Sequence, residues 1–72
     1  MKLDENKKLT LTEEELDLVK RANMMASPSI AGLYLRSSIR NRGLAESVEE
    51  LPDVNFYTEC IQAYRRKNYE VI

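Results

Sequence analysis

Residues 7–19, KKLTLTEEELDLV, change their hydrophobic period in the middle. The first part, Leu9–Thr12, alternates apolar and polar residues, which is typical of a half-buried strand. A helical pattern then begins, because Thr12 and Glu15 have the spacing of a capping box, in which each side chain accepts a hydrogen bond from the other residue's backbone. The sequence therefore predicts a short N-terminal strand followed directly by a helix over about residues 13–25.

Three more helices are predicted farther along the chain. The second begins at Ser27 and Pro28, since serine caps a helix and proline fits its first position, and it ends at Gly43. The third and the fourth cover about residues 44–51 and 54–68. The predicted fold class is mainly helical with one short N-terminal β-strand.

Apolar residues at helical spacing mark the sides that are expected to be buried. They are Leu16 and Val19 in the first helix, Ile30, Leu33, Tyr34, Ser37 and Ile39 in the second, with Leu35 widening that stripe, and Tyr57, Ile61 and Tyr64 in the fourth. Because a chain of 72 residues buries little surface alone, we expect self-association to add to this core.

The composition excludes several classes of site. The chain has no histidine and a single cysteine, Cys60, so we expect no zinc site, no internal disulfide and no cofactor. No histidine is present to activate that thiol, so Cys60 is expected to be a small core residue, and no enzymatic activity is expected. The charged start MKLDENKK lacks the apolar region of a signal peptide, and the run IAGLYL is too short to cross a membrane. A cytoplasmic location is expected.

The net charge of −1 is unevenly distributed. Residues 27–43 contain Arg36, Arg40 and Arg42 and no acidic residue, whereas residues 44–53 contain four acidic residues and no basic one. Because the local field matters more than the sum, these neighbouring segments predict two surfaces with different roles.

The lone strand is expected to find its partner in a second copy of the chain. Buried backbone groups need hydrogen-bond partners, and two antiparallel copies of KLTLT would supply them to each other. Leu9 and Leu11 would then point into a shared core, while Asn6, Lys8 and Thr10 would point outward together. Such a two-stranded ribbon fits the major groove of DNA, where these polar side chains reach base edges.

The order strand, capped helix, turn and second helix resembles the ribbon-helix-helix (Arc/CopG/MetJ) DNA-binding proteins. The stretches KLTLTEEELDLVKRA and SPSIAGLYLRSSI, within residues 6–43, carry this resemblance. It implies an intertwined homodimer, formed by residues 1–43, that reads bases through Asn6, Lys8 and Thr10. It also implies that the amides near Ser29 and Ile30 hold a phosphate at the start of the second helix. The dimer core would comprise Leu9, Leu11, Leu16, Val19, Ile30, Leu33 and Tyr34.

Under this interpretation the protein is a repressor, an antitoxin, or an accessory protein on plasmid or phage DNA. Arg36 and Arg40, four residues apart, would suit a phosphate patch or an ordinary solvent face. The C-terminal helical extension, residues 44–72, would enlarge the dimer interface or bind a second protein through Tyr57, Ile61 and Tyr64.

A second interpretation is a helical module that binds protein and not DNA. The stretch AGLYLRSSIRNRGLAESVE is similar, at AG and LAESVE, to the theta subunit of bacterial DNA polymerase III. The leucines of LTLT would then only pack against the first helix, and the chain would bind its partner as a monomer.

Overall fold

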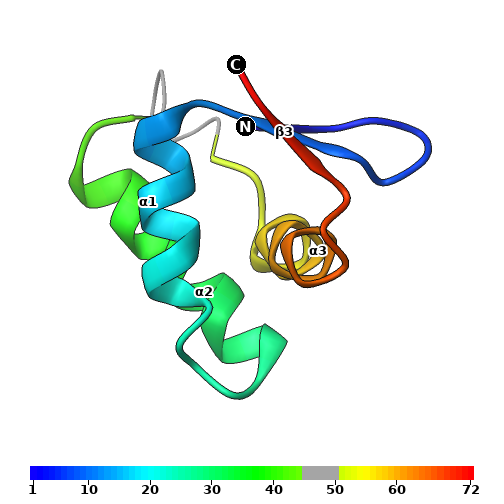
Figure 1. Cartoon of the computed structure of the whole chain (residues 1–72). Helices are drawn as coiled ribbons and strands as arrows, with labels where there is room; N and C mark the ends of the chain where they lie inside the picture. Colours follow the sequence, from blue (N-terminus) through cyan, green and yellow to red (C-terminus); the bar gives the residue numbers. More distant parts are fainter. Residues whose placement is uncertain (45–50) are drawn as a thin grey trace.

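The structure is a computed structural model that describes residues 1–44 and 51–72. In chain order its elements are β1 (Lys2–Leu3), β2 (Leu9–Leu11), α1 (Glu13–Ala22), α2 (Pro28–Asn41), α3 (Val54–Arg65) and β3 (Tyr69–Val71). Figure 1 shows the strands above α3, which is viewed end-on, with α1 and α2 to one side. The predicted mainly helical fold with an N-terminal strand is confirmed. The helix predicted over residues 44–51 lies almost entirely outside the described residues.

The strand predicted from LTLT is the centre of a three-stranded sheet with the order β1-β2-β3. On one edge β1 pairs antiparallel, with Lys2 opposite Thr10, and on the other β3 pairs parallel, with Leu9 opposite Tyr69. The expectation that the chain contains no second strand is therefore wrong. Neither β1, of two residues, nor β3, of three, was predicted from the sequence.

This pairing changes the argument for a ribbon between two copies. Both edges of β2 are occupied within one chain, so its backbone groups need no partner chain. A ribbon formed by two copies of β2 would require β1 or β3 to move aside. The ribbon-helix-helix arrangement stays a prediction.

The predicted capping box begins α1. The Thr12 side chain accepts a hydrogen bond from the Glu15 amide at 3.2 Å, and Glu15 Oε1 accepts one from the Thr12 amide at 2.8 Å. The N-terminal ammonium of Met1 also donates to Glu15 Oε2, at 2.8 Å. Burial alone would raise the pKa of Glu15, but the hydrogen bonds from Met1 and Thr12 lower it below its ordinary value.

The connection between α1 and α2 is held by α3. Arg65, at the end of α3, donates to Asn23 Oδ1 at 2.6 Å and to the carbonyl oxygens of Met25 at 2.7 Å and Ala26 at 3.3 Å. α1 ends at Ala22, three residues before the predicted boundary at residue 25. The turn that follows contains no glycine, and the Arg65 guanidinium holds it in place.

The core draws on residues from both predicted domains. Leu9, Leu11 and Val19 are fully buried, and α3 adds Tyr57, Cys60, Ile61 and Ala63 to the same cluster. Leu16 is half-buried at its margin. Residues 1–43 and the extension after Gly43 thus share one interior, and four of the predicted dimer-core residues, Leu9, Leu11, Leu16 and Val19, pack within a single chain.

The stripe predicted to bury α2 is largely on the wrong face. Ala31, Leu35 and Ile39 lie inside, whereas Ile30, Leu33 and Tyr34 are exposed. Of the predicted stripe only Ile39, with its flanking residue Leu35, is buried.

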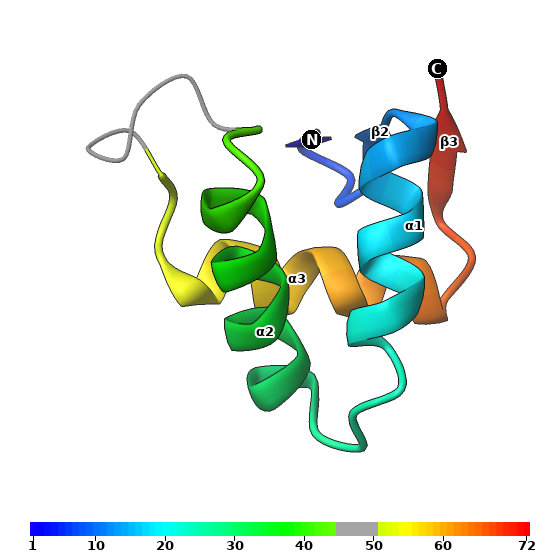
Figure 2. The same cartoon turned by 90° about the vertical axis from the view of Figure 1, so that its left-hand side faces the viewer.

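The cause is the close packing of α3 on α2, which Figure 2 shows crossing each other. A Cβ atom on Gly32 would lie 2.7 Å from the Thr58 amide nitrogen and 2.9 Å from its Cα. Only glycine allows the two backbones this close, so the side of α2 with the smallest residues faces inward.

Candidate functional site

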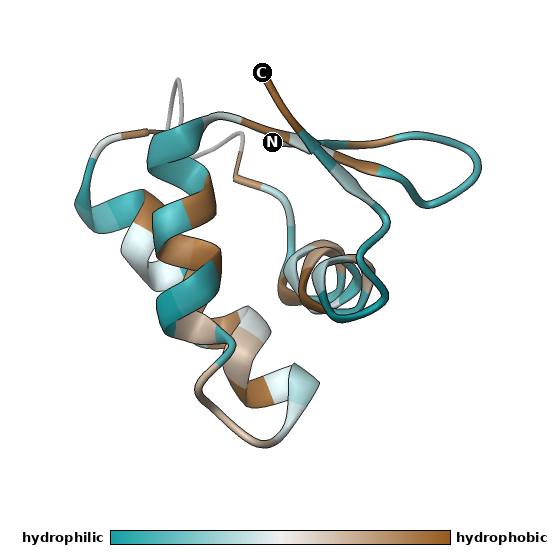
Figure 3. Cartoon of the chain, in the orientation of Figure 1, coloured by the Kyte–Doolittle hydropathy of each residue, from teal (hydrophilic) through white to brown (hydrophobic). Residues whose placement is uncertain are grey.

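The most distinctive surface of the protein is an apolar patch on α2, formed by Ile30, Leu33 and Tyr34, hereafter the α2 patch. These side chains are 58%, 55% and 42% exposed. Their spacing, i, i+3 and i+4, places them together on one face of the helix, and hydrophobic residues recur along α2 in Figure 3. Met24, in the turn before α2, is 85% exposed. Single exposed apolar residues are ordinary, but a row of three on a helix is typical of an interaction surface.

Among the described residues, positively charged groups lie at both ends of the α2 patch. At the start of α2, Ser27 makes no side-chain hydrogen bond to the helix, and the first turn contains no acidic residue, so the positive end of the helix dipole is not offset locally. At the other end Arg40 is exposed and lies seven residues after Leu33, two turns along the same face. No acidic residue occurs in residues 27–43.

The residues predicted to bind phosphate all lie on α2. Ser29 and Ile30 are exposed in the first turn of α2, and Arg40 is exposed near its end. Spacings of seven and four residues also place Arg36 on the same side of α2 as Ser29 and Arg40, but its Nε donates to the carbonyl oxygen of Pro52 at 2.9 Å and so ties α2 to the segment before α3. Arg36 is thus already engaged within the chain.

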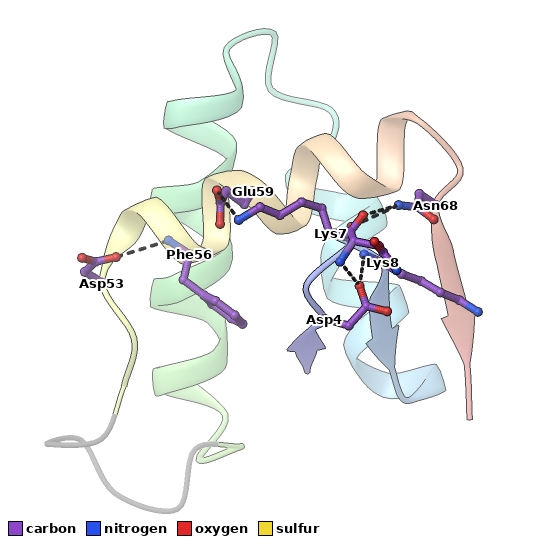
Figure 4. Close-up of polar contacts among 8 residues, drawn as sticks. Asp4, Lys7, Lys8, Asp53, Phe56, Glu59 and Asn68 are labelled. Carbon is purple, nitrogen blue, oxygen red and sulfur yellow. Dashed lines mark hydrogen bonds and ion pairs between the residues drawn. The ribbon is translucent and has the colours of Figure 1, made fainter.

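The predicted base-reading residues lie on or near the outer face of the sheet. Lys8 and Thr10 alternate with the buried leucines of β2, and Lys2 lies opposite Thr10 on the same face. Asn6 is in the turn between β1 and β2, where its amide donates to the Asp4 carboxylate at 2.8 Å. The Lys8 amide donates to the same carboxylate at 2.9 Å (Figure 4).

Acidic groups partly offset the positive charge of this face. Lys8 Nζ lies 3.1 Å from the Glu70 carboxylate, and Asp4 stands beside the turn. The expected clustering of Lys8 and Thr10 on one face is thus present, but without a strong positive field.

A small open cleft of about 230 Å³ lies between the β1–β2 turn and α3, lined by Lys7, Glu59, Gln62 and Arg66. Lys7 has a positive φ of 63°, and its Nζ reaches Glu59 at 3.2 Å across the cleft (Figure 4). Asn68 donates to the carbonyl oxygens of Asn6 and Lys7 and holds the turn in place. These contacts hold the β1–β2 turn against α3 and the residue before β3, so Lys7 and Glu59 have a structural role in the cleft.

The residues proposed for a partner on α3 are not available to one. Tyr57 and Ile61 are buried in the chain's own core, and Tyr64 packs against Tyr69 with ring centroids 5.1 Å apart. This corrects the expectation that another surface must cover them. Cys60 is buried as expected, and burial raises the pKa of its thiol to about 12.

Among residues 1–44 and 51–72 no group of histidine, cysteine, aspartate and glutamate side chains is arranged to hold a metal ion. None of the helices described is long and apolar enough to span a bilayer. Comparison with protein-family models, with curated proteins and with solved structures finds no match to the chain. The α2 patch and the sheet face are therefore judged on their own chemistry.

Proposed function

We propose that the protein is a small interaction module that binds another protein through the α2 patch. The observation that carries this proposal is the contrast between the two sides of α2. Leu35 and Ala31 are completely buried, while Ile30 and Leu33 on the opposite side are more than half exposed. An apolar row on a helix that is already anchored to a core suits helix-mediated recognition, in which i, i+3 and i+4 side chains serve as anchors.

The test uses the full chain as bait. Wild-type protein, an Ile30→Gln/Leu33→Gln variant and an Ile72→Gln control are immobilised and exposed to a lysate of the encoding organism, and bound proteins are identified by mass spectrometry. Glutamine keeps helix propensity while removing the apolar anchors. Ile72 is 75% exposed at the end of the chain, outside the α2 patch. We expect wild type and control to retain the same protein and the α2 variant to lose it. Equal recovery by all three would contradict the proposal.

A second candidate is DNA binding through the outer face of the sheet. It is favoured by one observation, the shared orientation of Lys2, Lys8 and Thr10, which are residue types that contact phosphates and base edges. In the form predicted from the sequence, the DNA-binding species is a homodimer that acts as a regulator or an accessory protein on plasmid or phage DNA.

Selection from a random DNA library and light scattering test this second candidate. Specific binding should require a dimeric mass and should be lost in a Lys8→Ala/Thr10→Ala variant that keeps the wild-type melting temperature. Selected sites that bind both proteins equally would rule out readout by the sheet face.

A further inference from the structure

We infer that the occupant of the α2 patch is an acidic amphipathic helix of a partner protein, an inference that rests on the proposed function and specifies its partner. The α2 patch provides three apolar anchors within one helical turn or slightly more. Because helices pack by fitting ridges of side chains together, such a row is matched best by another helix with apolar residues at the same spacing.

The sign of the partner's charge follows from the two ends of α2. The first turn of α2 contains no acidic residue to offset the positive end of its helix dipole. Arg40 lies on the same face as Leu33, about 10 Å farther along the axis. Arg42 is also exposed, at the end of the helix. A helix with acidic residues on both sides of its apolar anchors would therefore meet opposite charge at each end, which favours its association and disfavours basic competitors.

The same reasoning argues against a second copy of this chain on the α2 patch. If two α2 helices packed antiparallel, each Arg40 would face the positive start of the other helix. If they packed parallel, Arg40 would face Arg40 and the two positive starts would meet. In the antiparallel arrangement the negative end of each helix dipole, beside Arg40, offsets part of this repulsion. A second copy still brings no acidic side chain within residues 27–43, whereas an acidic helix does.

DNA is also a poor occupant of this face. Phosphate and base edges require hydrogen-bond donors and acceptors, whereas the centre of the face is formed by Ile30 and Leu33. The positive charge stands at the ends of the face and the apolar side chains stand between them.

The experiment uses two synthetic peptides of about 18 residues, long enough to span α2 as a helix. Both carry leucines at i, i+3, i+4 and i+7, and they differ only in having glutamate or lysine on both sides of these anchors. Binding to the full chain is measured by fluorescence anisotropy at low salt and at about 0.5 M salt. We expect the acidic peptide to bind at least about tenfold more tightly at low salt and this preference to shrink at high salt.

Variants test whether the preference for the acidic peptide arises at the α2 patch and its flanking arginines. Arg40→Glu/Arg42→Glu should reverse the preference, whereas Lys2→Glu/Arg66→Glu, with the same change in net charge at other exposed sites, should preserve it. Leu33→Gln should weaken both peptides, and melting temperatures should show that every variant is folded.

The alternative outcomes separate this inference from the proposed function. Equal binding of both peptides that still depends on Leu33 would overturn the acidic partner and leave the α2 patch as a binding surface. Absence of binding by either peptide would also overturn the inference, while the lysate experiment decides the proposed function independently. A dimeric mass that becomes monomeric in Leu33→Gln would replace the acidic partner with a second copy. Peptide binding unaffected by Leu33→Gln would place the site elsewhere and overturn the inference.

Discussion

The helices α2 and α3 use their apolar residues in opposite ways. On α3 the residues Tyr57, Cys60 and Ile61 face the core, and the remaining surface is mostly polar. On α2 one apolar row is buried against α3, and a second row, the α2 patch, is exposed. The apolar side chains of α3 are therefore taken up by the core, whereas α2 has exposed apolar side chains that the core does not require.

The largest expected difference between these helices is in thiol reactivity. In a Leu33→Cys variant the new thiol should react with iodoacetamide as an exposed thiol does, because residue 33 is 55% exposed. Cys60 should react at least about a thousandfold more slowly, because its sulfur becomes accessible only when the chain unfolds. Peptide mapping by mass spectrometry measures both rates in one molecule. Comparable rates would show that the core around α3 opens readily.

The two rows of α2 can be compared directly by alanine substitution. Leu35→Ala should lower the free energy of unfolding by about 2–5 kcal/mol, since Leu35 is fully buried. Leu33→Ala removes the same atoms from the exposed row and should change stability by no more than about 0.5 kcal/mol. Urea unfolding followed by circular dichroism measures both values. A large loss in Leu33→Ala would mean that another chain already covers the α2 patch.

The sequence predicted the starts of the helices better than their ends or the direction of their buried faces, since α1 and α3 each end three residues before the predicted boundary. The capping box at Thr12 and the start of α2 at Pro28 depend on local chemistry and are confirmed, although Ser27 precedes α2 without the side-chain hydrogen bond of a cap. The buried face of α2 depends instead on which side lets α3 approach closest. Because Ile30 and Leu33 are large and apolar, the sequence pattern favoured their burial. The residue that decides which face of α2 is buried is Gly32, which has no side chain.

The candidate surfaces also combine features that a local pattern predicts with features that depend on contacts between distant segments. Alternation in β2 correctly placed Lys8 and Thr10 on the side opposite the buried leucines. No sequence pattern indicates that Glu70 pairs with Lys8 or that Pro52 accepts a hydrogen bond from Arg36, because both contacts join distant segments. The exposure of the α2 patch followed from the same long-range packing.

A substitution where α2 and α3 cross tests whether their close packing determines which face of α2 is buried. Gly32→Ala should destabilise the protein by about 1–3 kcal/mol, because the added methyl group would press on the backbone of Thr58 and force α2 and α3 apart. Helix propensity alone would give the opposite sign, by about 1 kcal/mol. Ser37→Ala, on the other side of α2, is the control and should be neutral or slightly stabilising. A more stable Gly32→Ala protein would show that the helices have room to spare.

The buried face of α3 also predicts a loss of stability at alkaline pH. Burial raises the pKa of Cys60 from 9.0 to about 12, so the folded state holds a proton that the unfolded state releases above about pH 9. This contribution to stability is present below pH 9 and should be lost by up to about 1.4 kcal/mol per pH unit as the pH rises toward 12. Burial raises the pKa of Tyr57 too, with the same sign. Urea unfolding of wild type and Cys60→Ala between pH 7 and 11 should show a shallower decline in the variant, and parallel curves would contradict this account.

The smallest expected effect comes from the way the two helices end. Both close with the same pair of backbone bonds: Gly43 to Arg40 and Leu44 to Ile39 after α2, and Lys67 to Tyr64 and Asn68 to Ala63 after α3. Each needs a residue with positive φ, which is 66° at Gly43 and 60° at Lys67.

Glycine adopts that conformation freely, whereas lysine is strained in it by about 1 kcal/mol or more. Lys67→Gly should therefore stabilise the protein by up to about 1 kcal/mol, the gain being reduced by the greater freedom of glycine in the unfolded chain. Gly43→Ala should destabilise it by about 1 kcal/mol, and no atom of the described residues lies within 4 Å of the added methyl group to change that value. Thermal unfolding of both variants measures the pair. Opposite shifts would show that backbone strain alone distinguishes these two ends, whereas a less stable Lys67→Gly protein would mean that the lysine side chain contributes more than its backbone conformation costs.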